Sequence, residues 1–305
     1  MLNRRELMGG AASGAVAWTL GGCGPAAEMQ PLFSISLAQW SVYRRIFAGD
    51  LDPLDFPAFA RENFGIDAVE YVNQFFMDKA RDTAFLTQLR QRCEDHGVRS
   101  LLIMCDREGA LGDSDAQART QAVENHYKWV EAAAFLGCHS IRVNAQSQGS
   151  YDEQRGYAAD GLRRLSEFGA MHGLNVIVEN HGGLSSNGAW LAAVITDVGL
   201  ENCGTLPDFG NFFITPEQEY DRYLGVEQLM PFARGVSAKS YEFDAQGNAQ
   251  RTDFARMMRI VLDAGYRGYV GVEWEGETPG DIEGIRLTQA LLERVREELS
   301  ATYRA

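Results

Sequence analysis

The pattern of apolar and polar positions predicts short strands that alternate with amphipathic helices. Apolar runs bounded by polar turn residues are typical of strands buried in a parallel sheet. Between these runs, apolar residues recur at helical spacing, as at Leu162, Leu165 and Phe168. The expected strands span residues 33–38, 68–71, 100–104, 140–144, 175–180, 204–208, 235–239 and 268–274.

The spacing of these strands predicts how they are connected. Strand starts recur at intervals of roughly 30 to 40 residues, which is the length of a β-loop-α-loop unit. Glycines such as Gly65 and Gly137 stand where a helix should end before the next strand. Eight such units predict an α/β protein of the (β/α)₈ TIM-barrel class, with a doubly wound open sheet as the alternative. The first strand is followed by no G-x-G-x-x-G motif, which disfavours a dinucleotide-binding open sheet.

The N-terminal segment has the pattern of an export signal. Arg4-Arg5 and the short apolar stretch through Leu20 resemble a twin-arginine signal, and the Leu-Gly-Gly-Cys run ending at Cys23 resembles a lipoprotein box. Glycines interrupt the apolar stretch, which is too short for a membrane-spanning helix. We therefore expect a signal peptide over 1–22, a tether over 23–30 and a single catalytic barrel domain over 31–305. The expected location is the periplasm, with a lipid on Cys23 as the contact with the membrane.

Composition narrows the class of partner. The chain has 28 Lys and Arg against 42 Asp and Glu, a formal net charge of −14. This charge argues against binding to nucleic acid or to an anionic membrane surface, which both depend on basic side chains. Neutral ligands and cations remain as expected partners, and the oligomeric state is left open. The cysteines after Cys23 form no C-x-x-C pair, and we expect them to be buried small apolar residues.

Acidic and basic side chains fall where four of the expected strands end. Glu179 ends the fifth strand, Asp208 the sixth and Glu273 the eighth, while Lys239 ends the seventh. In a TIM barrel the C-terminal strand ends meet at the active-site mouth. Converging carboxylates repel one another unless a cation neutralises them, and their oxygens suit Mg²⁺ or Mn²⁺. The pattern predicts a divalent metal held by Glu179, Asp208 and Glu273; the alternative for each is a helix cap or an arginine pair.

Three motifs at these strand ends carry a family resemblance. They are Val178-Glu179-Asn180-His181-Gly182-Gly183, Leu206-Pro207-Asp208-Phe209-Gly210-Asn211 and Gly271-Val272-Glu273-Trp274-Glu275. Together they resemble the sugar isomerase/epimerase superfamily of xylose-isomerase-like TIM barrels, over essentially the whole chain that follows the N-terminal segment. The resemblance implies one divalent ion (Mn²⁺, Mg²⁺, Zn²⁺ or Co²⁺) held by Glu179, Asp208, a histidine on the seventh strand and Glu273.

The histidine of this pattern is missing. The seventh strand reads Ser237-Ala238-Lys239-Ser240, and all 5 histidines lie at or before residue 181. Three explanations remain open: the site is oxygen-rich and completed by water or Ser237, His181 reaches the metal, or metal binding has been lost. The endonuclease branch of the superfamily needs several histidines and a basic groove, and the chain has neither.

The resemblance implies a metal-dependent sugar or keto-sugar isomerase or epimerase with a small carbohydrate substrate. A proton next to a carbonyl would be removed through a metal-stabilised enediolate, with Glu179 and Glu273 as the proton-transferring carboxylates. Lys239 and His181 are the further candidates for proton transfer. The residues expected to bind substrate are Gln39, Trp40, Glu70, Arg142, Asn144 and Asn211.

Two other functions stay open. The same residues suit a metal-dependent lyase or hydratase that acts on keto-glycosides by β-elimination or the reverse hydration. A non-catalytic saccharide-binding lipoprotein is the second alternative. A sugar phosphate is disfavoured, because the ends of the seventh and eighth strands carry neither a basic cluster nor a glycine-rich phosphate cradle.

Overall fold

A computed structural model of the chain describes residues 31–303. The predicted signal peptide, tether and lipidated Cys23 lie outside these described residues and stay predictions. Within 31–303, none of the helices combines the length and the apolar character needed to span a membrane.

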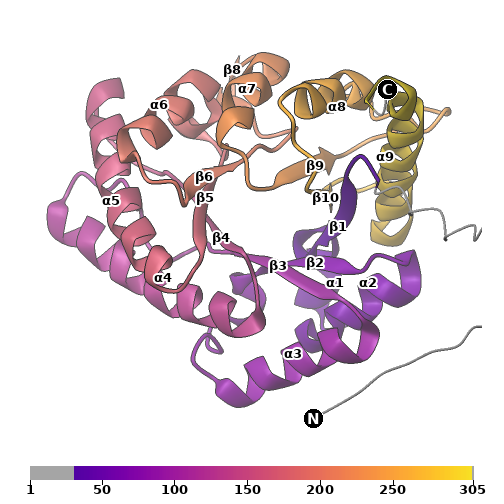
Figure 1. Cartoon of the computed structure of the whole chain (residues 1–305), viewed down its shortest axis with the longest axis horizontal. Helices are drawn as coiled ribbons and strands as arrows, with labels where there is room; N and C mark the ends of the chain where they lie inside the picture. The colour runs from indigo at the N-terminus through magenta and orange to yellow at the C-terminus, as the bar shows by residue number, and fades with distance from the viewer. Residues whose placement is uncertain (1–30, 304–305) are drawn as a thin grey trace, which may run out of the picture. The chain divides into compact units, whose positions relative to one another are not determined.

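Eight parallel strands form a barrel in the order β6-β5-β4-β3-β2-β1-β10-β9, as Figure 1 shows. The strands are β1 (Ser34–Ala38), β2 (Ala68–Val72), β3 (Arg99–Met104), β4 (Ser140–Val143), β5 (Asn175–Glu179), β6 (Cys203–Leu206), β9 (Val236–Ser240) and β10 (Tyr269–Trp274). Isolated parallel bridges, Thr205 with Ala233 and Asp208 with Ser237, join β6 to the β9 side. The predicted TIM barrel and all of its predicted strands are confirmed.

The helices surround the strands as an outer ring (Figure 1). They are α1 (Tyr43–Ala48), α2 (Phe56–Phe64), α3 (Thr83–His96), α4 (Ala116–Leu136), α5 (Tyr151–Met171), α6 (Gly188–Val198), α7 (Arg222–Leu229), α8 (Phe254–Asp263) and α9 (Asp281–Tyr303). A small antiparallel hairpin, β7 (Phe213–Thr215) with β8 (Gln218–Glu219), follows β6 and was not predicted. Its strands are too short to carry a readable alternation of apolar and polar residues.

Part of the acidic surplus is used to start helices. The side chains of Asp82, Asp115, Asp221 and Asp253 accept backbone N–H groups in the first turns of α3, α4, α7 and α8. Each such cap contributes about 1 kcal/mol to stability. Glu179, Asp208 and Glu273 cap no helix within residues 31–303, so helix capping does not explain these three carboxylates.

Two separate apolar clusters stabilise the barrel. The larger cluster packs the helices against the outer face of the strands and includes Trp129 and Trp190, both fully buried. The smaller cluster fills part of the barrel interior and consists of Ala38, Val72, Leu102, Met104, Ile177 and Leu206. None of its members comes from β9 or β10. On that side the buried side chains at the strand ends are polar and include Ser237, Lys239 and Glu273. Cys93, Cys105, Cys138 and Cys203 are buried free thiols, as predicted.

Candidate functional site

A pocket of about 380 Å³ opens where the strands end, as the barrel fold leads one to expect. Its lining residues are Trp40, Val72, Gln74, Asp106, Arg107, Arg142, Asn144, Gln146, His181, Lys239, Glu273 and Glu275. Six of the predicted site residues are therefore at the pocket: Trp40, Arg142, Asn144, His181, Lys239 and Glu273. The volume lies in the range of about 300 to 1,000 Å³ that is usual for small-molecule sites.

The three predicted metal ligands lie together. One carboxylate oxygen from each of Glu179, Asp208 and Glu273 lies within 4.8 Å of the others, and all three residues are buried. Among residues 31–303 this is the one group of three or more His, Cys, Asp or Glu side chains with such spacing. His181 is exposed at the pocket and is not part of the group, so the structure does not bring it to the triad.

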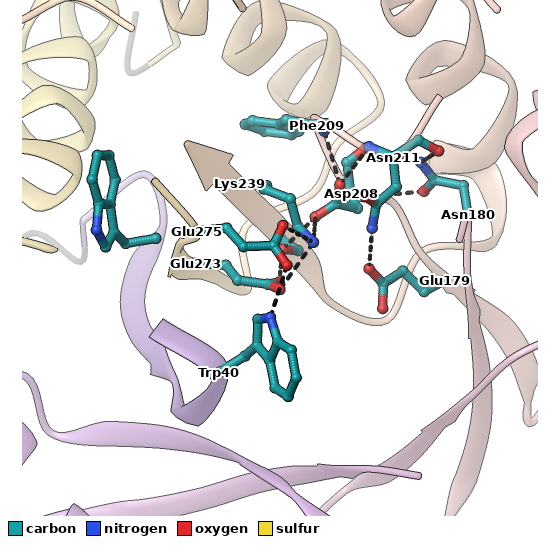
Figure 2. Close-up of polar contacts among 12 residues, drawn as sticks. Trp40, Glu179, Asn180, Asp208, Phe209, Asn211, Lys239, Glu273 and Glu275 are labelled. Atoms are coloured by element: carbon teal, nitrogen blue, oxygen red, sulfur yellow. Dashed lines mark hydrogen bonds and ion pairs between the residues drawn. The ribbon is translucent and has the colours of Figure 1, made fainter. Parts of the chain in front are cut away.

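Lys239 lies among these carboxylates, as Figure 2 shows. Its Nζ is 3.1 Å from Glu273 Oε1, 3.3 Å from Glu275 Oε2 and 4.0 Å from Asp208 Oδ2. Burial would lower the pKa of Lys239, but the surrounding carboxylates raise it well above its usual value. Burial would also raise the pKa of Glu275, which Lys239 nevertheless holds below its usual value. Lys239 is therefore a charged counter-ion here rather than a neutral base.

Ser237 connects two members of the triad. Its Oγ lies 2.8 Å from Asp208 Oδ2 and 2.7 Å from Glu273 Oε2. One hydroxyl proton can be donated to only one of these oxygens, so the other contact needs a further proton or a cation. Burial, together with the carboxylates of Glu179 and Glu273, raises the pKa of Asp208 to about 8 although Lys239 opposes the shift. Burial raises the pKa of Glu273 in the same direction.

Within the described part of the chain, Glu179 has a carboxylate oxygen that accepts no hydrogen bond. Its Oε1 accepts a hydrogen bond of 2.8 Å from Asn211 Nδ2 (Figure 2). Its Oε2 lies 2.8 Å from Arg142 Nε, but the N–H does not point at it, so the pair attracts by charge alone. A buried carboxylate oxygen that accepts no hydrogen bond, beside two crowded carboxylates, is the environment that an oxygen-binding divalent cation suits. The residues present therefore fit such an ion.

A second polar group lies at the C-terminal ends of β3 and β4, across the barrel from β9 and β10. Asp106 Oδ1 accepts hydrogen bonds from Arg142 Nη1 at 3.0 Å and from Asn144 Nδ2 at 2.8 Å. Its Oδ2 accepts one from Gln74 Nε2 at 3.1 Å. Burial would raise the pKa of Asp106, but the Arg142 guanidinium and these amides lower it to about 2. The sequence prediction missed Asp106, because it stands in a charged loop just beyond the expected end of the third strand.

Trp40 forms the aromatic side of the pocket. Its Nε1 donates to Glu275 Oε1 at 2.8 Å, and its ring stacks on Tyr43 with centroids 4.7 Å apart. Three other predicted substrate-binding residues do not line the pocket: Gln39, Glu70 and Asn211, the last of which donates to Glu179. Gln39 is fully buried and accepts the Val72 N–H, while Glu70 lies in the barrel interior and accepts the Ser36 hydroxyl at 2.6 Å.

Comparison with known families agrees with this geometry. The family model described as "Xylose isomerase-like TIM barrel" matches residues 58–298. The match covers well over half of the chain, and the protein therefore belongs to this family. The resemblance inferred from the three strand-end motifs is confirmed.

Two curated proteins are similar over a short part of the chain. A C-glycoside deglycosidase alpha subunit of Arthrobacter globiformis is 36% identical over 76 residues, 23% of this chain and 22% of the relative. A 3'-dehydrocarminate deglycosidase alpha subunit of a Microbacterium species is 31% identical over 77 residues, 24% of this chain and 22% of the relative. The chain thus matches about a fifth of the length of these relatives.

Solved structures share the fold over most of the chain. A 3-keto-D-glucoside 4-epimerase from E. coli matches with a TM-score of 0.66 and 18% identity, covering 80% of this chain and 94% of its own. The IOLI protein, solved with a zinc atom, has a TM-score of 0.68, 12% identity and coverage of 87% and 99%. A barrel protein from Mycobacterium smegmatis, solved with magnesium, has a TM-score of 0.64, 15% identity and coverage of 89% and 100%.

Proposed function

We propose that this protein is a divalent-metal-dependent isomerase or epimerase of keto-sugars. The observation that carries the proposal is the buried triad of Glu179, Asp208 and Glu273, whose member Glu273 lines the pocket together with Lys239. The family membership and the 3-keto-D-glucoside 4-epimerase among the similar folds support a small carbohydrate substrate. The zinc and magnesium in two similar structures support a metal ion.

The triad would hold the metal, with the Ser237 hydroxyl beside it. A divalent ion in such a site polarises a substrate carbonyl and stabilises the negative charge that forms on its oxygen. Asn211 orients Glu179 through the hydrogen bond to its Oε1. Lys239 holds Glu273 and Glu275 in place and limits the repulsion among the carboxylates.

In this proposal the carboxylates of the triad transfer the proton. Glu273 lines the pocket and would take the proton from the carbon next to the carbonyl, while the C–H electron pair moves toward the carbonyl. Glu179, a second member of the triad, would return a proton. Return to the same carbon gives an epimer, and return to the adjacent carbon gives an isomer. The polar group around Asp106, Arg142 and Asn144 would bind hydroxyl groups across the pocket.

Hydrogen exchange tests this proposal directly. The protein is incubated with methyl 3-keto-β-D-glucoside in D₂O, and loss of C–H signal beside the ketone is followed by NMR. Exchange should occur with the native protein, fall by about a hundredfold or more in Glu273→Gln, in line with the usual size of general-base effects, and persist in Glu124→Gln, an exposed change on α4. Exchange that is absent from the native protein, or equal in Glu273→Gln, would refute the proposal.

A second candidate is a lyase that releases the aglycone from keto-glycosides by β-elimination. The short similarity to two deglycosidase subunits favours it. Both functions begin with removal of a proton from a carbon beside the ketone, so they would share Glu273 and the metal. Release of methanol from the same probe would favour the lyase, whereas exchange or a new stereoisomer without release would favour the epimerase. A saccharide-binding lipoprotein without activity would show neither.

A further inference from the structure

Arg107 has an unusual backbone at the edge of the pocket. It lies in the loop between β3 and α4, lines the pocket, and has a φ of 62°. Within residues 31–303 it is the one residue other than glycine with a positive φ. A side chain in this left-handed region is sterically unfavourable, and such conformations persist where the surrounding structure holds them, often at ligand sites.

The acidic neighbours of Arg107 are already paired. Asp106 accepts from Arg142, and Glu108 Oε1 lies 2.9 Å from Lys128 Nζ and accepts from Trp129 at 2.6 Å. Across the part of the chain that the structure describes, Arg107 has no carboxylate within 4.0 Å and donates no side-chain hydrogen bond, as the ion pairs and hydrogen bonds of this loop show. The other two cations of the pocket, Arg142 and Lys239, both contact carboxylates.

Arg107 also lies where two cavities meet. A second cavity of about 210 Å³ reaches the loop between β3 and α4 and is lined by Glu108 and His126, among others. Asp106, Arg107, Asn144 and Gln146 line both this cavity and the main pocket. A ligand in the main pocket thus has a route to the guanidinium without displacing an existing ion pair.

We propose that Arg107 binds a carboxylate of the substrate, so that the preferred substrates are keto-sugars that carry an acid group, such as keto-uronates. This inference rests on the proposed function, in which the ketone end of the substrate reacts at Glu273 and the metal. One planar guanidinium matches one carboxylate through two parallel hydrogen bonds. A phosphate dianion fits less well, because Asp106, Glu273 and Glu275 line the same pocket. Among residues 31–303, no second unpaired Lys or Arg lines the pocket beside Arg107.

Binding of two unreactive probes tests the inference. Methyl β-D-glucuronide and methyl β-D-glucoside differ in one carboxylate and carry no ketone, so their dissociation constants can be measured by calorimetry without turnover. The native protein should bind the glucuronide about tenfold or more tightly, as a charge-assisted hydrogen-bonded pair implies. Arg107→Gln should abolish this preference, while Arg61→Gln, an exposed change on α2, should keep it.

A second variant separates binding from folding. Arg107→Gly removes the guanidinium but suits the positive φ, so it should keep the melting temperature of the native protein and still lose the preference. A glucuronide that binds no better than the glucoside, or too weakly to detect, overturns the inference. So does a preference that survives in Arg107→Gln and Arg107→Gly. Hydrogen exchange on the methyl 3-keto-β-D-glucoside probe is independent of these results, so either proposal can fail alone.

Discussion

Ser237 and Asp208 form one of the isolated parallel bridges that close the barrel, and the Ser237 hydroxyl lies 2.8 Å from Asp208 Oδ2. The two residues whose backbones close the barrel between β6 and β9 therefore also contact each other through their side chains, within the acidic cluster. The superfamily pattern has a histidine at the position of Ser237. With serine there, the metal-ligand atoms that Glu179, Asp208, Glu273 and Ser237 offer are all oxygens.

We expect this oxygen-only site to prefer Mg²⁺ or Mn²⁺, and Ser237→His to shift the preference toward Zn²⁺. Imidazole nitrogen suits zinc, whereas carboxylate and hydroxyl oxygens suit the harder ions. The shift in relative affinity should be about tenfold or more, since even residues that only orient a ligand change affinity by roughly that factor. Dialysis against equal concentrations of the three ions, followed by elemental analysis, measures it.

Ser237→Ala is the matched control, because it removes the hydroxyl without adding a nitrogen. It should bind metal more weakly but keep the native order of preference. If the native protein took up zinc in preference to manganese, or Ser237→His left the order unchanged, the idea that Ser237 sets the preference would fail.

Lys239 should be as important for stability as for activity. Its removal in Lys239→Met leaves Glu273 and Asp208 buried without their counter-ion, which for buried pairs costs about 3–5 kcal/mol in the free energy of unfolding. Urea unfolding at pH 8 should show this loss, and millimolar Mn²⁺ should restore part of it. Lys79→Met, which alters an exposed pair, should change the free energy by less than about 1 kcal/mol. A variant as stable as the native protein would contradict the counter-ion role.

The barrel and its acid cluster were predictable for a simple physical reason. Parallel strands buried on both faces appear as continuous apolar runs, and their polar C-terminal residues must converge at one end of the barrel. That reasoning predicts that Glu179, Asp208 and Glu273 lie together, as they do in the structure. Trp40, Arg142 and Asn144, which are predicted to bind substrate, line the pocket.

Other features depend on distances that the sequence does not contain. Glu70 lies in the middle of β2 rather than at its end, so its side chain lies inside the barrel, because depth along a strand depends on the register with its neighbours. Gln39 begins the turn after β1, and its side chain is used to accept the Val72 N–H. The sequence prediction misses Asp106 and Arg107 because they lie in a loop and not on a strand. Their loop reads as a solvent-exposed charged turn, and only the fold shows that it borders the pocket.

Glu70 provides a test of stability against pH. It is fully buried, and its Oε2 has no hydrogen-bond partner among residues 31–303. Burial raises its pKa to about 7, helped by Glu273 and Glu179 and opposed by the Ser36 hydroxyl. A raised pKa in the folded state means that folding favours the protonated form. The associated stability is fully present below the unfolded pKa near 4.5 and is lost as the pH rises through about 7.

Glu70→Gln should therefore be as stable as the native protein at pH 4.5 and more stable at pH 8, by up to about 3 kcal/mol at the usual 1.36 kcal/mol per pKa unit. Glutamine has the shape of the protonated acid and can still accept the Ser36 hydroxyl, but it never ionises. Urea unfolding at the two pH values gives the difference between variant and native protein, in which the titration of all other groups largely cancels. Glu124→Gln, an exposed change, should show no such dependence. A Glu70→Gln difference that is the same at both pH values would mean that Glu70 does not ionise in the folded barrel over this range.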